Sequence, residues 1–514
     1  MERDELPLDR RLRQEILFAR ERVYRFGKPT PLERLILPEG GPEIWVKRED
    51  LSPIKAYKWR GACNRMATLT PPERAAGVVT ASAGNHAQGV ALAACALGIQ
   101  ARIYMPRPTP RVKQVAVRQH GGHQVEIILS GDSYDEAVTA AREDVARTGA
   151  TYVHAYDDLQ VMAGQGTLAD EVVLSGHGPF DAAYLQIGGG GMIGGVSAWL
   201  KTYWPEIEVV GVEGEGQASM KAALEAGSPT PLEHVDIFCD GTAVRKAGEL
   251  PFEICKDTVD RVETISNSDV SRAIRGLWEG LRCISEPSGA MGLAAVMKNR
   301  EQLAGKKILI VVTGANVDFL QLGLIAQSEG SAQNVSRTLR VRIPERPGTM
   351  LNLLNTCFEG VNVADFQYGK LHESDAWPAF TITAEDPAVL KGIPDRLAQH
   401  GFEWQDLTGA VDIQFRAIPL RGDLLGFPVF LRLDFYERPG ALHDFLARHV
   451  HAEVNLCYFN YRQSGERIGR ALLGLDFGTA MDRQTFLASL PEQGDGYRSC
   501  TPVDEVTRER LTGH

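Results

Sequence analysis

The 514-residue sequence lacks the signatures of a zinc, secreted or membrane protein. Its eight cysteines are scattered, and no two have the Cys-x-x-Cys spacing of zinc and redox motifs. This pattern fits reduced thiols and predicts a cytoplasmic location. The charged start, Met1 to Glu5, is followed by no apolar signal core. The longest apolar run, Val90 to Ile99, is about half the length of a membrane span.

An excess of positive charge is also absent. The formal net charge is -11, which argues against a nucleic-acid or anionic-membrane partner. The composition, 44% hydrophobic and 24% charged, is typical of a globular protein. A chain of this length is too long for one hydrophobic core, so two to four domains are expected.

The first part of the chain, residues 1–332, alternates short β-branched runs with helical patterns. This alternation predicts an α/β domain with parallel sheets and helices on both faces. In such folds, ligands collect at the carboxyl ends of the strands. The expected strands are 77–80, 101–105, 125–129, 182–187, 209–213 and 308–313, and a helix is expected from about His86.

An internal repeat occupies the rest of the chain. The segment Glu345-Arg346-Pro347-Gly348 recurs as Glu437-Arg438-Pro439-Gly440. Each copy follows an alternating strand pattern and precedes an amphipathic helix pattern, and a strand with a tyrosine comes next. Two tandem α+β modules of βαββαβ type, 337–410 and 426–508, explain this repeat. The flanking strands are expected at 339–343 and 429–433, and the helices at 349–357 and 441–450.

One lysine, Lys58, is the candidate catalytic residue. A lysine amine forms an imine with an aldehyde, and burial lowers its pKa from about 10.4 so that the free amine becomes accessible. A single lysine is more often a solvated surface charge, and Lys55 is interpreted in that way. The case for Lys58 therefore depends on three distant segments.

The first segment, Thr80 to Gly89, joins a strand to a helix. Its small residues let main-chain N–H groups face a ligand, and the helix N-terminus favours an anion such as a carboxylate. Asn85 could hydrogen-bond a phenolic oxygen. The alternative is a tight turn in which Ser82 or Asn85 caps the helix. His86 is interpreted as a structural residue at the helix start.

The second segment contains four consecutive glycines, Gly188 to Gly191, between a strand and a helix. Such a run exposes main-chain amides that can hold a phosphate. It also matches the dinucleotide fingerprint Gly-x-Gly-x-x-Gly, and Glu213 follows about 20 residues later, so a nicotinamide dehydrogenase is the rival from another enzyme class. In the third segment, Thr313 could place a hydroxyl beside a ring nitrogen, although alone it is an ordinary strand end.

Together these segments resemble the pyridoxal phosphate (PLP) enzymes of fold type II, the tryptophan-synthase-β-like group, and within them the biosynthetic threonine dehydratases (threonine deaminases). The resemblance implies a two-lobed catalytic domain followed by two ACT-like regulatory modules. It spans almost the whole chain. The matching pieces are 56–62, 80–89, 163–168, 188–191, 285–290 and 313–317.

The resemblance also implies the roles of individual residues. Lys58 would be the Schiff-base lysine, Asn85 would contact the 3′-oxygen of the cofactor, and Thr313 would face the pyridine nitrogen. The phosphate would be wrapped by Gly188, Gly189, Gly190, Gly191 and Met192. The substrate carboxylate would be received by Ser82, Ala83 and Gly84.

Three positions depart from the family pattern. Ala56 stands where serine is common, which removes a hydroxyl and puts any role for it in doubt. Thr313 also replaces a serine, but it keeps the hydroxyl. Ser219 stands where some relatives have a carboxylate that binds a cation, so no metal is predicted.

The implied activity is conversion of L-threonine to 2-oxobutanoate and ammonia, the first step of isoleucine biosynthesis. Isoleucine would inhibit the enzyme and valine would oppose it, through sites that include Gly348, Tyr368, Gly440 and Tyr461. A homo-oligomer is expected, with a tetramer favoured. The alternatives are a related serine or threonine deaminase, a racemase, and a non-enzymatic amino-acid sensor. For the paired modules, the alternative is simple oligomer scaffolding.

Overall fold

A computed structural model describes most of the chain. The described residues are 6–37, 40–318, 321–323, 325, 336–344, 349–367, 375–384, 386–408, 425–436, 445, 454–462, 468–490 and 497–512. The chain divides into two compact units, Met1–Asp318 and Phe319–His514. None of the described helices is long and apolar enough to cross a bilayer.

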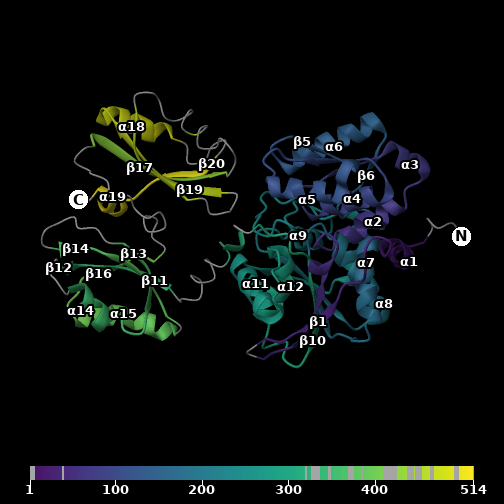
Figure 1. Ribbon diagram of the computed structural model, residues 1–514, viewed down its shortest axis with the longest axis horizontal. Helices are drawn as coiled ribbons and strands as arrows, with labels where there is room; N and C mark the ends of the chain where they lie inside the picture. Colours follow the sequence, from purple (N-terminus) through teal and green to yellow (C-terminus); the bar gives the residue numbers. More distant parts are fainter. Residues whose placement is uncertain are drawn as a thin grey trace. The chain divides into compact units, whose positions relative to one another are not determined.

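Unit 1 contains two sheets, and the smaller one is wholly parallel, in the order β5-β4-β3-β6 (Figure 1). Its strands are β3 (Val78–Ala81), β4 (Ala101–Met105), β5 (Val125–Leu129) and β6 (Thr151–Tyr152). The accompanying helices are α2 (Trp59–Ala67), α3 (Pro71–Ala76), α4 (Asn85–Leu97), α5 (Arg111–Gly121) and α6 (Tyr134–Thr148). β3 is buried along its whole length, as expected for a strand of a parallel sheet that is covered on both faces.

The larger sheet has the order β1-β2-β10-β7-β8-β9. Only the β1–β2 pair is antiparallel. The strands are β1 (Leu32–Leu35), β2 (Glu43–Arg48), β7 (Ala182–Gln186), β8 (Glu208–Gly214), β9 (Arg261–Ile265) and β10 (Lys307–Val312). The helices of this part are α1 (Leu8–Val23), α7 (Leu159–Leu174), α8 (Gly191–Tyr203), α9 (Ser219–Ala226), α10 (Glu249–Thr258), α11 (Asn267–Leu281) and α12 (Pro287–Lys298).

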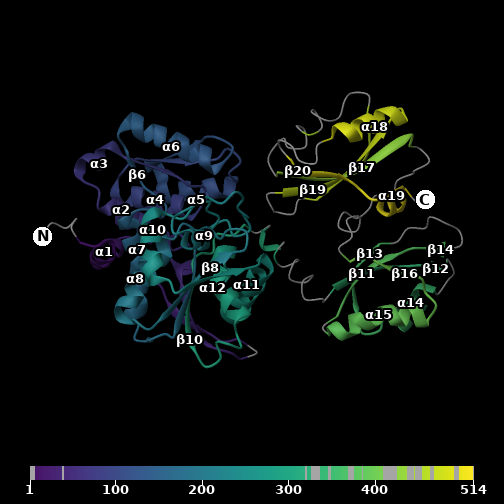
Figure 2. The ribbon, with the colours of Figure 1, turned by 180° about the vertical axis from the view of Figure 1, so that it is seen from behind.

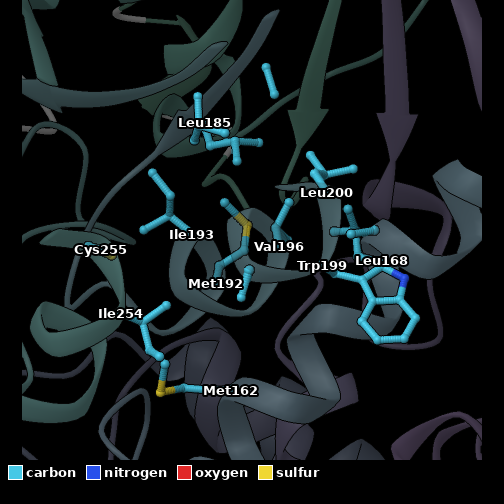
Figure 3. Packing of buried hydrophobic residues seen from close by; sticks show 14 of the residues in the cluster. Met162, Leu168, Leu185, Met192, Ile193, Val196, Trp199, Leu200, Ile254 and Cys255 are labelled. Atoms are coloured by element: carbon cyan, nitrogen blue, oxygen red, sulfur yellow. The ribbon is translucent and has the colours of Figure 1, made fainter. Parts of the chain in front are cut away.

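A dense apolar core holds α8 in place beneath the glycine run. Met192, Ile193 and Val196 of this helix pack with Met162 of α7 and Ile254 of α10 (Figure 3). The first ten residues of α8 are buried. The start of α8 is therefore a rigid platform, since close-packed interiors leave side chains little freedom to move.

Unit 2 contains two four-stranded antiparallel sheets with the same topology (Figure 2). The first has the order β13-β15-β11-β16 and the second β18-β19-β17-β20, so in each module the strands follow the order second, third, first, fourth. The strands are β11 (Ser336–Val341), β13 (Asn362–Gln367), β15 (Ala379–Thr383), β16 (Trp404–Asp406), β17 (Phe427–Tyr436), β18 (Asn455–Arg462), β19 (Ile468–Phe477) and β20 (Tyr497–Pro502). The helices include α14 (Thr349–Cys357), α15 (Pro387–Gln399), α18 (Ala480–Ser489) and α19 (Glu505–Thr512). The short strands β12 (Ile343–Pro344) and β14 (Asp375–Ala376) form a separate pair.

The predicted α/β class and the pair of α+β modules are confirmed. One predicted strand, 339–343, is wrong at its end, because β11 stops at Val341 and Ile343 pairs with Ala376 in a different sheet. Most of the predicted helix 441–450 lies outside the described residues. The predicted domain limits, 1–332, 337–410 and 426–508, stay predictions.

Candidate functional site

The segment that carries Lys58 is fastened to the carboxyl end of β10. Ala56 and Gly314 form an antiparallel bridge. On either side of this bridge, the Tyr57 N–H donates to the Thr313 carbonyl at 2.9 Å, and the Ala315 N–H donates to the Lys55 carbonyl at 2.9 Å. Two segments more than 250 residues apart in the sequence are thus joined by main-chain bonds. Their place at the end of a central parallel strand is where ligands bind in this class of fold.

The Lys58 amine has a neutral main-chain carbonyl as its hydrogen-bond partner. Its Nζ donates to the carbonyl oxygen of Ala155 at 2.9 Å and lies 5.3 Å from the centre of the Tyr57 ring. Burial lowers the pKa of Lys58 to about 8, and the negative charge of Glu286 only partly opposes this shift. Lys55, in contrast, is exposed. At neutral pH, Lys58 therefore has a much larger fraction of free amine than a surface lysine.

Asn85 lies at the centre of a hydrogen-bonded chain of side chains. Its Nδ2 donates to both carboxylate oxygens of Glu286, at 2.9 and 3.1 Å, and its Oδ1 accepts from Nδ2 of Asn316 at 2.7 Å. Burial raises the pKa of Glu286 to about 7, whereas the bond from Asn85 lowers it. The orientation of the Asn85 amide is fixed from both sides.

The start of α4 leaves main-chain donors available. Its N-cap is Gly84, which supplies no side-chain cap, and the Ser82 hydroxyl accepts from the Gly84 N–H at 3.3 Å instead. The interpretation of Ser82 or Asn85 as a helix cap is therefore wrong. Ser82, Ala83 and Gly84 are partly exposed, so a carboxylate can reach this helix end.

His86 has the structural role expected of it. Its side chain is buried, and its Nε2 is 3.0 Å from the carbonyl oxygen of Val153. Burial, together with the nearby charge of Lys58, lowers the pKa of His86 to about 3. The imidazole is therefore neutral, and the contact with the carbonyl places its proton on Nε2.

The four glycines form a turn with close approaches on the protein side. Gly190 has φ +91°, in the left-handed region that favours glycine. A Cβ on Gly191 would lie 2.8 Å from the carbonyl oxygen of Tyr156. No hydrogen bond between described residues is donated by the main-chain N–H groups of 188–192, the last two of which open α8. Their free donors and the positive end of the helix suit one phosphate group.

The carboxylate on which the dinucleotide interpretation depends is already occupied. Glu213, at the end of β8, is fully buried, and it accepts from the main-chain N–H groups of Met220 and Lys221 at 2.9 Å each. These bonds hold the first turn of α9 and leave no open carboxylate for a ribose. Ser219 is buried beside it. Among the described residues, no cluster of three or more ligand-type side chains could hold a metal ion.

Thr313 is buried at the end of β10, and its Oγ1 accepts from Nε2 of Gln186 at 3.1 Å. Of the predicted effector residues, Gly348, Tyr368 and Gly440 lie outside the described residues. Tyr461 lies in β18, where its main chain is opposite Ala471 of β19.

Four residues at this site had no predicted role. Gln186 is the last residue of β7, and Glu286 directly precedes α12. Ala155 and Tyr156 follow β6. Glu286 belongs to a segment recognised in the sequence, so its charge was a usable signal. The other three carry no motif, and only the fold brings Ala155 to Lys58, Gln186 to Thr313 and Tyr156 to the glycine turn.

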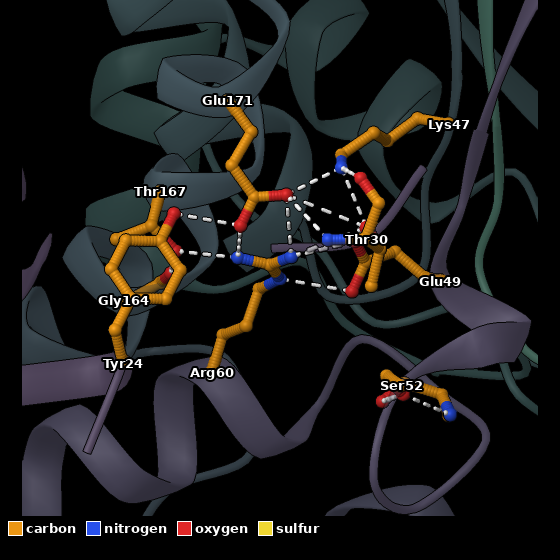
Figure 4. A network of polar contacts seen from close by, with 10 residues as sticks. Tyr24, Thr30, Lys47, Glu49, Ser52, Arg60, Gly164, Thr167 and Glu171 are labelled. Atoms are coloured by element: carbon orange, nitrogen blue, oxygen red, sulfur yellow. Dashed lines mark hydrogen bonds and ion pairs between the residues drawn. The ribbon is translucent and has the colours of Figure 1, made fainter. Parts of the chain in front are cut away.

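A second buried polar cluster surrounds Arg60, two residues after Lys58 (Figure 4). The Arg60 guanidinium donates to both carboxylate oxygens of Glu49, at 2.8 and 2.9 Å, and to those of Glu171, at 2.6 and 3.0 Å. Lys47 donates to Glu171 and, at 2.6 Å, to the hydroxyl of Thr30. The two cations and two carboxylates of this Arg60 cluster balance one another.

Comparisons with known proteins agree with this geometry. The model of a family described as pyridoxal-phosphate dependent enzyme matches residues 23–314. The model described as the C-terminal regulatory domain of threonine dehydratase matches residues 428–508. The biosynthetic L-threonine dehydratase of Burkholderia multivorans is 36% identical over 93% of this chain and 95% of its own length. The corresponding protein of Escherichia coli is 35% identical over 89% of each chain.

Solved structures are similar to unit 1. Threonine deaminase isoform 2 of Solanum lycopersicum has a TM-score of 0.59 and 37% identity, over 62% of this chain and 93% of that one. Maize serine racemase has a TM-score of 0.57 and 31% identity, over 62% and 97%.

The fold, the buried lysine and the free amides of the glycine turn define a pyridoxal-phosphate-dependent enzyme of fold type II. The residues fit the cofactor, because an aldehyde needs an accessible amine and a phosphate needs unpaired donors. Within this class, the chain belongs to the biosynthetic threonine dehydratase family.

Proposed function

We propose that this chain converts L-threonine to 2-oxobutanoate and ammonia, as the first step of isoleucine biosynthesis. The observation that carries the proposal is the Lys58 amine, which has a pKa of about 8 and lies at the strand ends where the Asn85, glycine and Thr313 segments meet. The relatives named biosynthetic L-threonine dehydratase, which match along nearly the full chain, support the choice of substrate.

The cofactor is held by residues of four segments. Lys58 would bind the aldehyde carbon through its amine, Asn85 would contact the 3′-oxygen, and Thr313 would face the pyridine nitrogen. The phosphate is bound by the main-chain N–H groups of Gly188, Gly189, Gly190, Gly191 and Met192. When bound, pyridoxal phosphate supplies an electron sink for the charge that develops at the substrate α-carbon.

The residues of the chain then orient the substrate and move its protons. Ser82, Ala83 and Gly84 bind the carboxylate at the N-terminus of α4. The Lys58 amine would remove the α-proton, and the β-hydroxyl would take up a proton and leave as water. The released product would then take up water as it loses ammonia. The atoms of threonine are thus conserved in 2-oxobutanoate and ammonia.

The C-terminal modules regulate this reaction. Isoleucine binds and inhibits, and valine opposes it, at sites that include Gly348, Tyr368, Gly440 and Tyr461. The match of residues 428–508 to a regulatory domain supports this role, as does the shared strand order of the two modules. Regulation requires that each effector bind the active and inactive states with different affinity. We also propose a cytoplasmic homotetramer with domain limits at 1–332, 337–410 and 426–508.

An assay of 2-oxobutanoate production from threonine, with and without isoleucine, tests the proposal. We expect turnover of threonine, inhibition by isoleucine and relief by valine. A chain truncated after about residue 330 should remain active and become insensitive to isoleucine. Production of D-serine, or a clear preference for serine, would instead favour the racemase or serine deaminase activity, and unchanged inhibition of the truncated chain would contradict the regulatory role.

A further inference from the structure

The buried side chain of Gln186 bridges three oxygen atoms at the end of β7. Its Nε2 lies 2.9 Å from the Val311 carbonyl oxygen, 3.0 Å from the Ser288 carbonyl oxygen and 3.1 Å from the Thr313 hydroxyl. Main-chain pairing of β7 with β10 ends at Tyr184 and Ile310, so the side chain continues the contact where the ladder stops.

The two carbonyls determine which way the Gln186 amide faces. A carbonyl oxygen only accepts hydrogen bonds, so both Val311 and Ser288 require the nitrogen of the amide at this position. If the amide oxygen stood there instead, it would face the two carbonyl oxygens in a buried site. At least one of these three acceptors would then lack a hydrogen-bond donor. In the observed orientation, Oε1 has no partner among the described residues. The polarity of the amide is thus fixed by main-chain atoms that cannot rotate.

This polarity restricts the proton of Thr313. An amide nitrogen has two hydrogens and no free lone pair, so the Thr313 hydroxyl can share a hydrogen of Gln186 with the two carbonyls but cannot donate to it. No other hydrogen bond of this hydroxyl is present within the described part of the chain. Its proton therefore remains available to an acceptor that comes from outside the protein.

A second buried glutamine shows that the opposite polarity also occurs. Gln217 donates through Nε2 to the carbonyls of Asp236 and Cys239, and its Oε1 is 3.0 Å from the Thr242 hydroxyl, from which it accepts. Both glutamines contact two carbonyls and one threonine hydroxyl. Only at Gln186 does the hydroxyl face the nitrogen.

We propose that Gln186 is a positioning residue that holds the Thr313 hydroxyl as a hydrogen-bond donor toward the ring nitrogen of the cofactor. This inference rests on the proposed PLP site. A hydroxyl that donates to the nitrogen, in place of a carboxylate that would protonate it, keeps the pyridine ring neutral. Gln186 acts through Thr313 and does not itself touch the cofactor.

The test is a double-mutant cycle with Gln186→Met and Thr313→Val, measured on the full chain. Methionine keeps the length of the side chain and removes the donor, and valine keeps the shape of threonine and removes the hydroxyl. PLP affinity of the apoprotein and the pH dependence of the absorption spectrum of the bound cofactor are recorded for all four proteins. These readouts separate positioning from general loss of stability.

In the presence of Thr313, we expect Gln186→Met to weaken PLP binding about 3- to 10-fold, the loss of one hydrogen bond, and to change the spectral pH profile. With valine at 313, the same substitution should change neither. Equal effects in both backgrounds, or none in either, would overturn the inference. Gln186→Glu is a second route if the methionine variant does not fold. Its oxygens accept from the hydroxyl, so it should weaken binding in the same Thr313-dependent way.

The wild-type protein separates the two proposals. If it binds no PLP and makes no 2-oxobutanoate, the proposed function is wrong, and the inference fails with it. If it binds PLP and turns over threonine but Thr313→Val has no effect on affinity or spectrum, only the inference is overturned.

Discussion

Two polar sites are centred two residues apart in the sequence, at the start of α2, and they are built in opposite ways. Arg60 is fully buried, and its guanidinium pairs with the carboxylates of Glu49 and Glu171. Lys47 also pairs with Glu171, so two positive charges face two negative charges. Lys58 faces only a neutral carbonyl at hydrogen-bond distance. The Arg60 cluster is satisfied internally, whereas the Lys58 site has unused donors in the glycine turn and at the start of α4.

The pKa values of Arg60 and Lys58 follow from this difference, although burial also lowers the pKa of Lys47 within the Arg60 cluster. Burial alone would lower the pKa of Arg60, but Glu49 and Glu171 raise it above its ordinary value, so the charge is permanent. Burial lowers the pKa of Lys58 to about 8, because no close carboxylate compensates. A cluster whose charges are paired within the protein joins elements of the fold. A site whose amine has no close carboxylate can instead bind a ligand. The Arg60 cluster joins α2 to α7 and β2. It thereby supports the helix that begins directly after Lys58.

The largest effect is expected for Lys58→Met, which should lower threonine turnover at least about a thousandfold. A positioned base alone contributes about a hundred- to ten-thousandfold, and Lys58 also holds the cofactor. Production of 2-oxobutanoate measures the loss. Lys55→Met is the matched control and should retain near-normal activity, because Lys55 is exposed. Near-normal deamination by the Lys58 variant would refute the assignment of the catalytic lysine.

Arg60→Met should lower the free energy of unfolding by about 3–5 kcal/mol, since it leaves two buried carboxylates without their main partner. Denaturant unfolding of the ligand-free protein measures this change. The control is Arg25→Met, just after α1, whose pair with Glu21 is exposed and should contribute at most about 0.5 kcal/mol. A loss from Arg60→Met no larger than that of the control would mean that the Arg60 cluster is not structural.

Lys58→Met should have the opposite effect on stability and raise the free energy of unfolding of the ligand-free protein by up to about 3 kcal/mol at pH 7. The folded-state pKa of about 8 lies below the ordinary 10.5, so between these values the unfolded chain binds more protons. Wild-type stability therefore rises with pH through this window, and the advantage of the variant should shrink there. Lys47→Met, which breaks a compensated pair, should destabilise instead. The same sign for both lysine variants would end the distinction between the two clusters.

The smallest effect is expected for Glu286→Gln, whose stability relative to the wild type should rise by about 1–2 kcal/mol between pH 5 and pH 8. The folded-state pKa of about 7 lies above the ordinary 4.5, so the folded protein retains a proton that the unfolded chain releases between these values. Wild-type stability should therefore fall as the pH rises through this window. Unfolding measured at pH 5 and pH 8 checks the sign, and a variant gain that is equal at both would contradict it.

Much of the fold was predictable because local patterns and burial agreed. The strands at 101–105 and 125–129 match β4 and β5 at both ends, and the repeated segments lie in two modules with one strand order. The strands β1, β2, β6 and β9 of unit 1 were not predicted. β6 has only two residues, and β2 mixes charged with apolar residues because Lys47 and Arg48 turn toward buried carboxylates. These strands form because their residues contact partners that lie far away in the sequence.

The sequence by itself determined the chemical inventory of the site: the lysine, the asparagine loop, the glycine run and the threonine hydroxyl, together with their order. It could do so because each is a local signal of residue type and spacing. Only the tertiary structure decided what surrounds them, since a pKa, a hydroxyl proton and a fixed amide depend on contacts across the fold. Gln186 against Thr313, Glu286 against Asn85 and Glu171 against Arg60 join segments 111 to 201 residues apart. No local pattern records such pairs.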